Sequence, residues 1–219
     1  MIKFAPQLIN LFATLILLLA FAMISQRRIV SLINLFMLQG AALVAASFLL
    51  GYATHQPELY VSGALTLVLK VILIPWMLHR MIRKLNVRWD VETLLNIPTT
   101  MLVGIGLVIF SFSLALPISR LSDSIAGGSL GIALACVFLS FMMMITRSKA
   151  VPQVIGFLSM ENGLLFAATT VTNGMPMIVE FGIALDVLVG VLILGVFMFQ
   201  IREKFDSLDI HHLESLKED

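Results

Sequence analysis

Cysteine is nearly absent from this chain of 219 residues, and charged residues are scarce. The one cysteine, Cys136, lies in an apolar run without a partner, which excludes disulfides, CxxC redox chemistry and cysteine-ligated clusters within the chain. Charged residues make up 12% of the chain, too few to coat a soluble globule. Gly-rich phosphate loops, nucleophile elbows and zinc-ligand spacings are missing as well. We therefore expect no catalytic residues, no metal site and no cofactor in this chain.

Long hydrophobic runs are what the sequence does contain. The hydrophobic fraction is 59% and the mean hydropathy is +1.03. A helix needs about 20 apolar residues to cross a bilayer, and such runs follow one another with short polar links between them. The sequence predicts an all-α, polytopic membrane helix bundle with about seven transmembrane helices. We place the spans at 4–24, 29–51, 59–82, 94–117, 127–146, 151–172 and 177–200.

The basic residues are concentrated in alternate links. Of the 14 lysines and arginines, two (Lys3 and Arg120) fall on one side, and Lys70 falls inside a helix. The positive-inside rule then places the N-terminus outside and the C-terminus in the cytoplasm. The other eleven belong to the first, third and fifth links and the tail: Arg27, Arg28, Arg80, Arg83, Lys84, Arg88, Arg147, Lys149, Arg202, Lys204 and Lys217.

Helices one to three and five to seven resemble two copies of one unit. Residues 32–46 align with residues 154–168, with Gln39 on Glu161, and Lys70 falls on Asp186 after a six-residue difference in the length of the outer loop. The fourth helix would return the chain to the outer side, so that the two units are parallel. The alternative is seven unrelated spans with a shared hydrophobic composition. We divide the chain into a three-helix unit (1–90), a linking helix and loop (91–126), a second three-helix unit (127–204) and a polar cytoplasmic tail (205–219).

Two carboxylates lie deep in the predicted spans. Glu161 and Asp186 are about ten and nine residues into their helices, which at about 1.5 Å per residue puts them more than 10 Å from the nearer end. An ionised carboxylate at that depth costs about 2.5–3.5 kcal/mol, so it usually faces the bundle interior and is paired, hydrated or protonated. These conditions suit a proton relay. The alternative is a carboxylate that hydrogen-bonds a neighbouring subunit.

Lys70 is the one basic residue at the middle of a predicted span. Pro75 follows five positions later and cannot donate to the carbonyl of Val71, so we expect a helix kink beside the ammonium. A kinked helix with a buried lysine could act as a switch. A fixed salt bridge, for example to Asp186, is the alternative.

Four further polar residues are possible supporting groups. Gln39 and Asn162 lie within spans, where they could hold water or form cross-helix hydrogen bonds, each of which contributes about 0.6 kcal/mol. Glu180 lies one turn into the seventh helix near the outer surface, and His79 lies close to the inner surface. The His211-His212 pair in the tail has no further ligands and does not predict a metal site.

The C-terminal half resembles the three-helix K subunit of respiratory complex I and its small counterpart in multisubunit cation/proton antiporters. The resemblance rests on residues 154–163 and on residues 185–190, where Asp186 precedes Gly190 by four positions. Those families carry an acid at that place, so the resemblance implies a relay role for Asp186. The second-helix glutamate of the K subunit falls on Leu158, and Glu161 lies three residues later, nearly one helical turn.

The whole chain, including its tail from Phe205 to Leu216, resembles the component E family of hydrogenase-4 complexes. That resemblance implies a non-redox subunit in a bacterial-type inner membrane, which contributes to the translocation of protons or sodium ions. Its expected partners are antiporter-like subunits, the membrane anchor of the hydrogenase arm and the lipid bilayer, with no nucleic acid. Nickel-iron and iron-sulfur centres are then expected on partner subunits. The alternatives are a structural scaffold of the same complex, a component of a cation/proton antiporter and a stand-alone secondary transporter.

Overall fold

The computed structural model describes residues 5–85, 96–119 and 126–171, in which all the elements are helices. Three of them, α3, η2 and α4, follow one another without interruption and form one long third helix. The bounds are α1 Ala5–Ser25, α2 Ile29–Thr54, α3 Pro57–Thr66, η2 Leu67–Leu73, α4 Ile74–Leu85, α5 Ile97–Ser119, α6 Ala126–Thr146 and α7 Ala150–Val171.

Six helices in the described part of the chain are long and apolar enough to cross a membrane, and they match the first six predicted spans. The observed helices run a few residues past several predicted ends: α2 continues to Thr54, and the third helix continues to Leu85. Hydropathy marks the end of the apolar run, whereas the backbone stays helical into the polar surface layer. The seventh predicted span, 177–200, lies outside the described residues.

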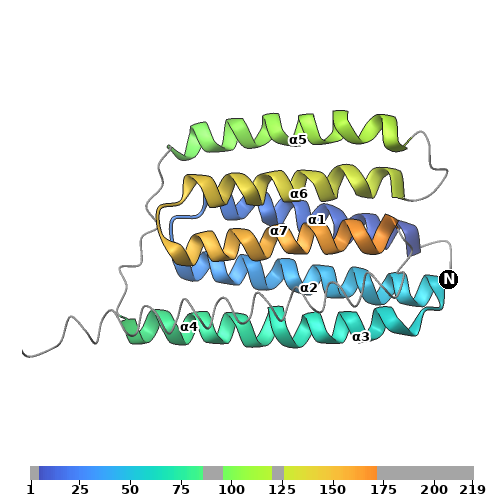
Figure 1. Ribbon diagram of the computed structural model, residues 1–219, viewed down its shortest axis with the longest axis horizontal. Helices are drawn as coiled ribbons and strands as arrows, with labels where there is room; N and C mark the ends of the chain where they lie inside the picture. Colours follow the sequence, from blue (N-terminus) through green and yellow to red (C-terminus); the bar gives the residue numbers. More distant parts are fainter. Residues whose placement is uncertain (1–4, 86–95, 120–125, 172–219) are drawn as a thin grey trace, which may run out of the picture.

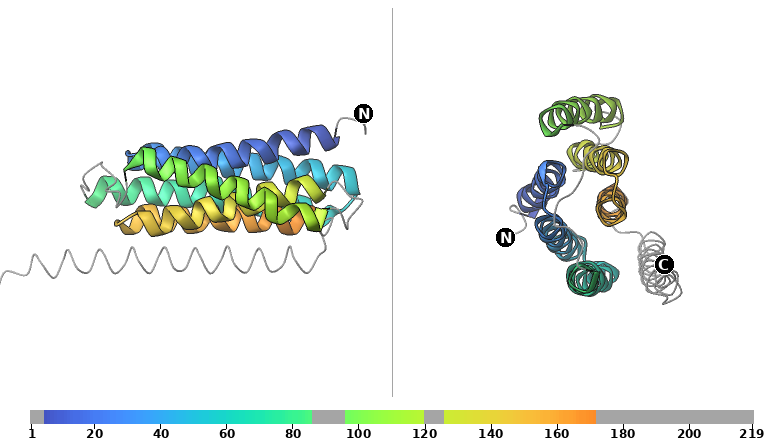
Figure 2. Two further views of the ribbon diagram at one scale, coloured as in Figure 1. Left: turned by 90° about the horizontal axis from the view of Figure 1, so that it is seen from above. Right: turned by 90° about the vertical axis from the view of Figure 1, so that its left-hand side faces the viewer.

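The helices are antiparallel to their neighbours in sequence and form two rows. In the end-on view of Figure 2, α1, α2 and the α3–α4 helix form one row, and α6 and α7 form a second row beside it. The main contacts between the rows join α1 to α6 and α2 to α7. Helices that the predicted repeat equates are thus neighbours, although the repeat itself stays a prediction.

Helix α5 lies at the edge of the bundle, where it contacts α6 and α1 (Figures 1 and 2). It is the least buried of the six candidate spans, and Leu102 and Ile109 are more than 60% exposed. The core lies instead between the two rows. It contains the buried side chains of Phe36, Leu43 and Leu158, among others.

Three of the basic segments of the described chain lie at one end of the bundle. The α1–α2 link, the end of α4 and the α6–α7 link are all at the left-hand end in Figure 1. This is the arrangement that the positive-inside rule requires. The orientation of the termini relative to a membrane stays a prediction.

His55 ends α2 in a left-handed backbone conformation, with φ 57° and ψ 31°. It is exposed, and its backbone N–H donates to the carbonyl of Gly51. Glycine adopts this conformation without a Cβ penalty. We expect His55→Gly to raise the unfolding free energy by about 0.5 kcal/mol and His55→Val to lower it by about 1 kcal/mol. Thermal unfolding of the purified variants in detergent measures both, and a more stable valine variant would contradict this account.

Candidate functional site

A buried ion pair joins the two rows of helices. Lys70 Nζ in η2 lies 3.3 Å from Glu161 Oε2 in α7, and the two side chains are 0% and 3% exposed. The alternative of a salt bridge at Lys70 is therefore the one observed, but its partner in the described residues is Glu161. Asp186, the partner of Lys70 that the sequence suggests, lies outside the described residues, as does Glu180.

The pair lies deep in the bundle. Lys70 is near the middle of the candidate span Pro57–Arg80, and Glu161 is near the middle of Val151–Thr170. At about 1.5 Å per residue, each is more than 10 Å from both ends of its span. Neither side chain can readily extend to a membrane surface from that depth. Separating the two groups would remove the attraction between two charges in an apolar medium, which is costly.

The helix is π-helical around Lys70, where the sequence predicts a kink. In η2 the hydrogen bonds span five residues, and the N–H of Ile74 donates to the carbonyl of Leu69 just beyond its last residue. Pro75, which has no N–H, follows directly. The missing donor is thus accommodated by a wider turn that contains the lysine. Such π-helical turns are rare and occur frequently at functional sites.

Gly40 allows α2 to approach the lysine closely. A Cβ added at Gly40 would lie 3.3 Å from Val71 Cγ2 and 3.7 Å from Lys70 Cβ. The first of these distances is tighter than an ordinary van der Waals contact. A side chain at this position would therefore require Val71 to shift by a few tenths of an ångström.

Two buried amides extend the polar site towards α1. Asn162 Nδ2 donates to Gln39 Oε1 over 3.3 Å, and Gln39 Nε2 donates to the carbonyl of Ile16 over 3.5 Å. Both side chains are fully buried. Asn162 directly follows Glu161, so the amide pair fixes the rotation of α7 beside the carboxylate. The expectation that Gln39 and Asn162 form cross-helix hydrogen bonds is confirmed, and their contribution to function stays a prediction.

His79 lies away from this cluster. It is half-buried, and its Nδ1 donates to the carbonyl of Pro75 over 2.8 Å within α4. The structure thus places His79 one helical turn beyond Pro75, near the basic end of the bundle. In the described residues, no group of three or more His, Cys, Asp and Glu side chains is arranged to hold a metal ion.

Arg147 has a structural role that its place in a basic link does not indicate. The side chain is 1% exposed, and its Nη2 donates to the carbonyls of Ile24 and Met23 over 2.7 and 3.4 Å. These carbonyls are at the C-terminal end of α1, where helices leave carbonyl groups unpaired. Burial lowers the pKa of Arg147, which lies between two candidate spans. A basic residue directly after an apolar run gives no sequence signal of such burial.

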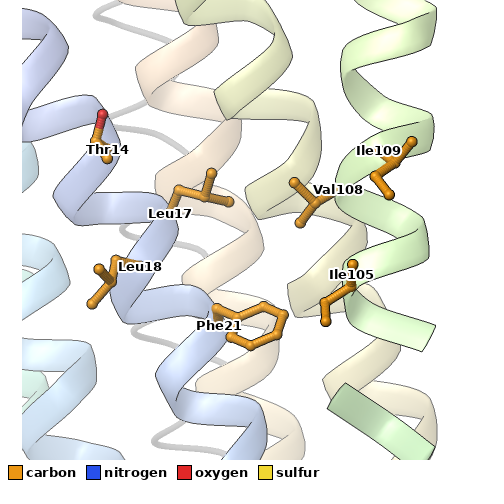
Figure 3. A pocket seen from close by; sticks show the side chains of 7 residues that line it. All are labelled: Thr14, Leu17, Leu18, Phe21, Ile105, Val108 and Ile109. Carbon is orange, nitrogen blue, oxygen red and sulfur yellow. The ribbon is translucent and has the colours of Figure 1, made fainter. Parts of the chain in front are cut away.

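An apolar groove of about 330 Å³ lies between α1 and α5 (Figure 3). Its walls include Leu17, Phe21 and Val108, and the hydroxyl of Thr14 donates to the carbonyl of Asn10 in its own helix. A small-molecule site usually has several convergent polar groups. This groove has none, so it does not favour the transporter alternative.

Comparisons with known proteins identify relatives over most of the length. The uncharacterised protein Rv0085 of Mycobacterium tuberculosis is 31% identical over 194 residues, 88% of each chain. Hydrogenase-4 component E of Escherichia coli and of Shigella flexneri is 22% identical over 179 residues, 82% of this chain and 83% of the relative. No protein-family model and no solved structure matches the chain. The chain therefore belongs to the family of Rv0085, and it has a distant similarity to hydrogenase-4 component E.

Proposed function

We propose that this chain is a non-redox membrane subunit of an energy-converting hydrogenase complex related to respiratory complex I, and that it contributes to ion translocation. The observation that carries the proposal is the Lys70–Glu161 pair, held at mid-span depth with both side chains buried. Ionisable groups at such depth are expensive and usually belong to ion pathways or proton relays. The distant similarity to hydrogenase-4 component E supports the kind of complex.

In this proposal Glu161 and Asp186 are relay carboxylates and Lys70 modulates the relay. When the ammonium moves away from Glu161, the carboxylate loses its compensating charge and binds a proton instead. When the ammonium returns, the proton is released. The π-helical turn around Lys70 supports such a movement, because its hydrogen bonds already depart from the α-helical pattern.

The redox chemistry would take place on other subunits. Nickel-iron and iron-sulfur centres belong to those partners, and the present chain packs between antiporter-like subunits and the membrane anchor of the hydrogenase arm. Exposed faces such as that of α5, with Leu102 and Ile109, provide apolar surface for such packing.

The test measures proton translocation by the intact complex in vesicles, driven by its own electron donor. We expect Glu161→Gln and Asp186→Asn each to reduce translocation to the background of vesicles without the complex. The control is Glu58→Gln, because Glu58 is exposed in the first turn of α3 and should be dispensable. Unchanged translocation in an assembled Glu161→Gln complex would remove the relay from the proposal.

A structural scaffold in the same complex is the second candidate. It is favoured by the direct bridge that the ion pair makes between η2 and α7, which fixes how the rows meet. Under this alternative the same variants reduce co-purification with partner subunits, while each complex that still assembles translocates protons normally. Co-purification in mild detergent therefore separates the two candidates.

A further inference from the structure

Positive charge is concentrated where the α1–α2 and α6–α7 links meet. Arg27 and Arg28 are exposed in the first link, and Arg147 is buried in the second. The guanidinium of Arg147 reaches the carbonyls of Ile24 and Met23, so the two links are in direct contact. The exposed Arg27 and Arg28 and the buried Arg147 thus all lie where these four helix ends come together.

In the described part of the chain, the carbonyls at the C-terminal end of α1 accept from Arg147, but no carboxylate lies at these links. The two carboxylates of that part are Glu58, in the first turn of α3 at the opposite end of the bundle, and Glu161, which is paired with Lys70 at mid-span. Arg147 Nη1 is buried and has no hydrogen-bond partner among the described residues. Burial also lowers the pKa of Arg147, as expected for a cation that has lost water.

Two of the four helix ends at these links are N-termini, and the other two are the C-termini of α1 and α6, whose dipoles oppose theirs. Helices α2 and α7 both begin at these links, with no acidic residue in the first turn of either. No side chain caps the N-terminus of α2. The unpaired N–H groups and the helix dipole at such an end favour a bound anion.

The links lie at the depth of lipid headgroups. Arg27 and Arg28 fall between the candidate spans that end at Ser25 and begin at Ile29, and Arg147 directly follows the span that ends at Thr146. On α4, near the same end, the guanidinium of Arg80 lies 5.2 Å from the ring centre of the exposed Trp76. Trp side chains are enriched at membrane–water interfaces, which supports this depth.

We propose that the surface formed by the α1–α2 and α6–α7 links binds the phosphate of an anionic phospholipid headgroup. Arg27 and Arg28 contact the phosphate, the N-terminus of α2 faces it, and Arg147 lies behind it as a buried positive charge. Inorganic phosphate offers the same charged group. A phospholipid is favoured because the exposed apolar helix faces continue from this surface into the bilayer, where acyl chains lie. The inference is independent of ion translocation.

The experiment uses the full chain, purified in neutral detergent and titrated with dioleoyl phosphatidylglycerol or with dioleoyl phosphatidylcholine. Native mass spectrometry counts the bound lipids, and thermal unfolding reports their effect on stability. We expect phosphatidylglycerol to bind and to raise the unfolding temperature. In the double variant Arg27→Gln/Arg28→Gln its dissociation constant should rise roughly thirtyfold. The matched control is Arg80→Gln/Arg83→Gln, which removes the same charge from α4 and should bind the lipid as the unchanged chain does.

Four results would overturn the proposal. Equal binding of phosphatidylcholine would exclude recognition of the anionic headgroup. Equal losses in the two double variants would indicate a diffuse basic surface without a site. Displacement of the lipid by inorganic phosphate at equal concentration would indicate a phosphate-ion site. Lipid binding that requires removal of residues 201–219 would show that the acidic tail normally occupies the surface.

Discussion

Lys70→Met and Glu161→Gln should each lower the unfolding free energy by about 3–5 kcal/mol, and the double variant should regain most of that loss. Each single change leaves one charge buried without its partner 3.3 Å away. The double change removes both charges together. Methionine and glutamine also keep much of the volume of the side chains that they replace, so few packing contacts are lost.

Reversible unfolding in mixed detergent micelles measures this double-mutant cycle. The control cycle combines Arg80→Met with Glu58→Gln, because these residues are exposed near opposite ends of the long third helix. Their effects should add within about 0.5 kcal/mol. Additive losses in the Lys70–Glu161 cycle would mean that the two groups do not stabilise each other.

The same double variant also bears on function. If the pair serves only to fix the two rows of helices, the regained stability should be accompanied by regained ion translocation. If Glu161 is a relay group, translocation should stay absent, because glutamine cannot take up and release a proton. Stability and translocation measured on one set of variants therefore separate the two proposed functions.

Gly163→Leu should lower the unfolding free energy by about 1–3 kcal/mol. A Cβ at this buried position of α7 would lie 3.1 Å from Cys136 Cβ and 3.3 Å from the backbone N of Val137. Backbone in α6 cannot move aside as a flexible side chain can, so the two helices must separate. Since Gly163 follows Glu161 by two positions, the separation should also disturb the ion pair.

The matched control for this prediction is Gly106→Leu on α5. A Cβ at Gly106 would meet no atom within 4 Å, and the position is exposed. Leucine has a higher helix propensity than glycine, by up to about 1 kcal/mol, so this change should stabilise the protein or leave it unchanged. Thermal unfolding of both variants compares the same substitution in two surroundings. Equal destabilisation of both would contradict the close approach of α6 and α7.

The membrane helices were predictable because the signal is local. A run of about 20 apolar residues has few alternatives to a spanning helix, so the first six spans follow from hydropathy. The depth of Lys70 and Glu161 follows in the same way, from their position within a run. Their pairing cannot be predicted from the sequence, because it depends on how the two rows of helices pack. That packing produces no periodic pattern of residues. The sequence equally allowed Lys70 to pair with Asp186.

Two details of the site depend on structure that local patterns do not encode. Pro75 indicates a disturbed helix, but a kink and a π-helical turn both satisfy its missing donor, and only the contacts around Lys70 select between them. Arg147 has the sequence pattern of a solvated link residue. Its burial results from the meeting of two links more than a hundred residues apart in the sequence.

The Lys70–Glu161 contact also constrains how the protein is made. Glu161 follows Lys70 by about 90 residues in the sequence, and at roughly 5–20 residues per second its codon is translated some seconds after that of the lysine. During that interval the third helix is made before the Glu161 side chain that pairs with Lys70 in the folded protein. The insertion machinery, lipid headgroups or water must therefore accommodate the charge of Lys70 until α7 is made.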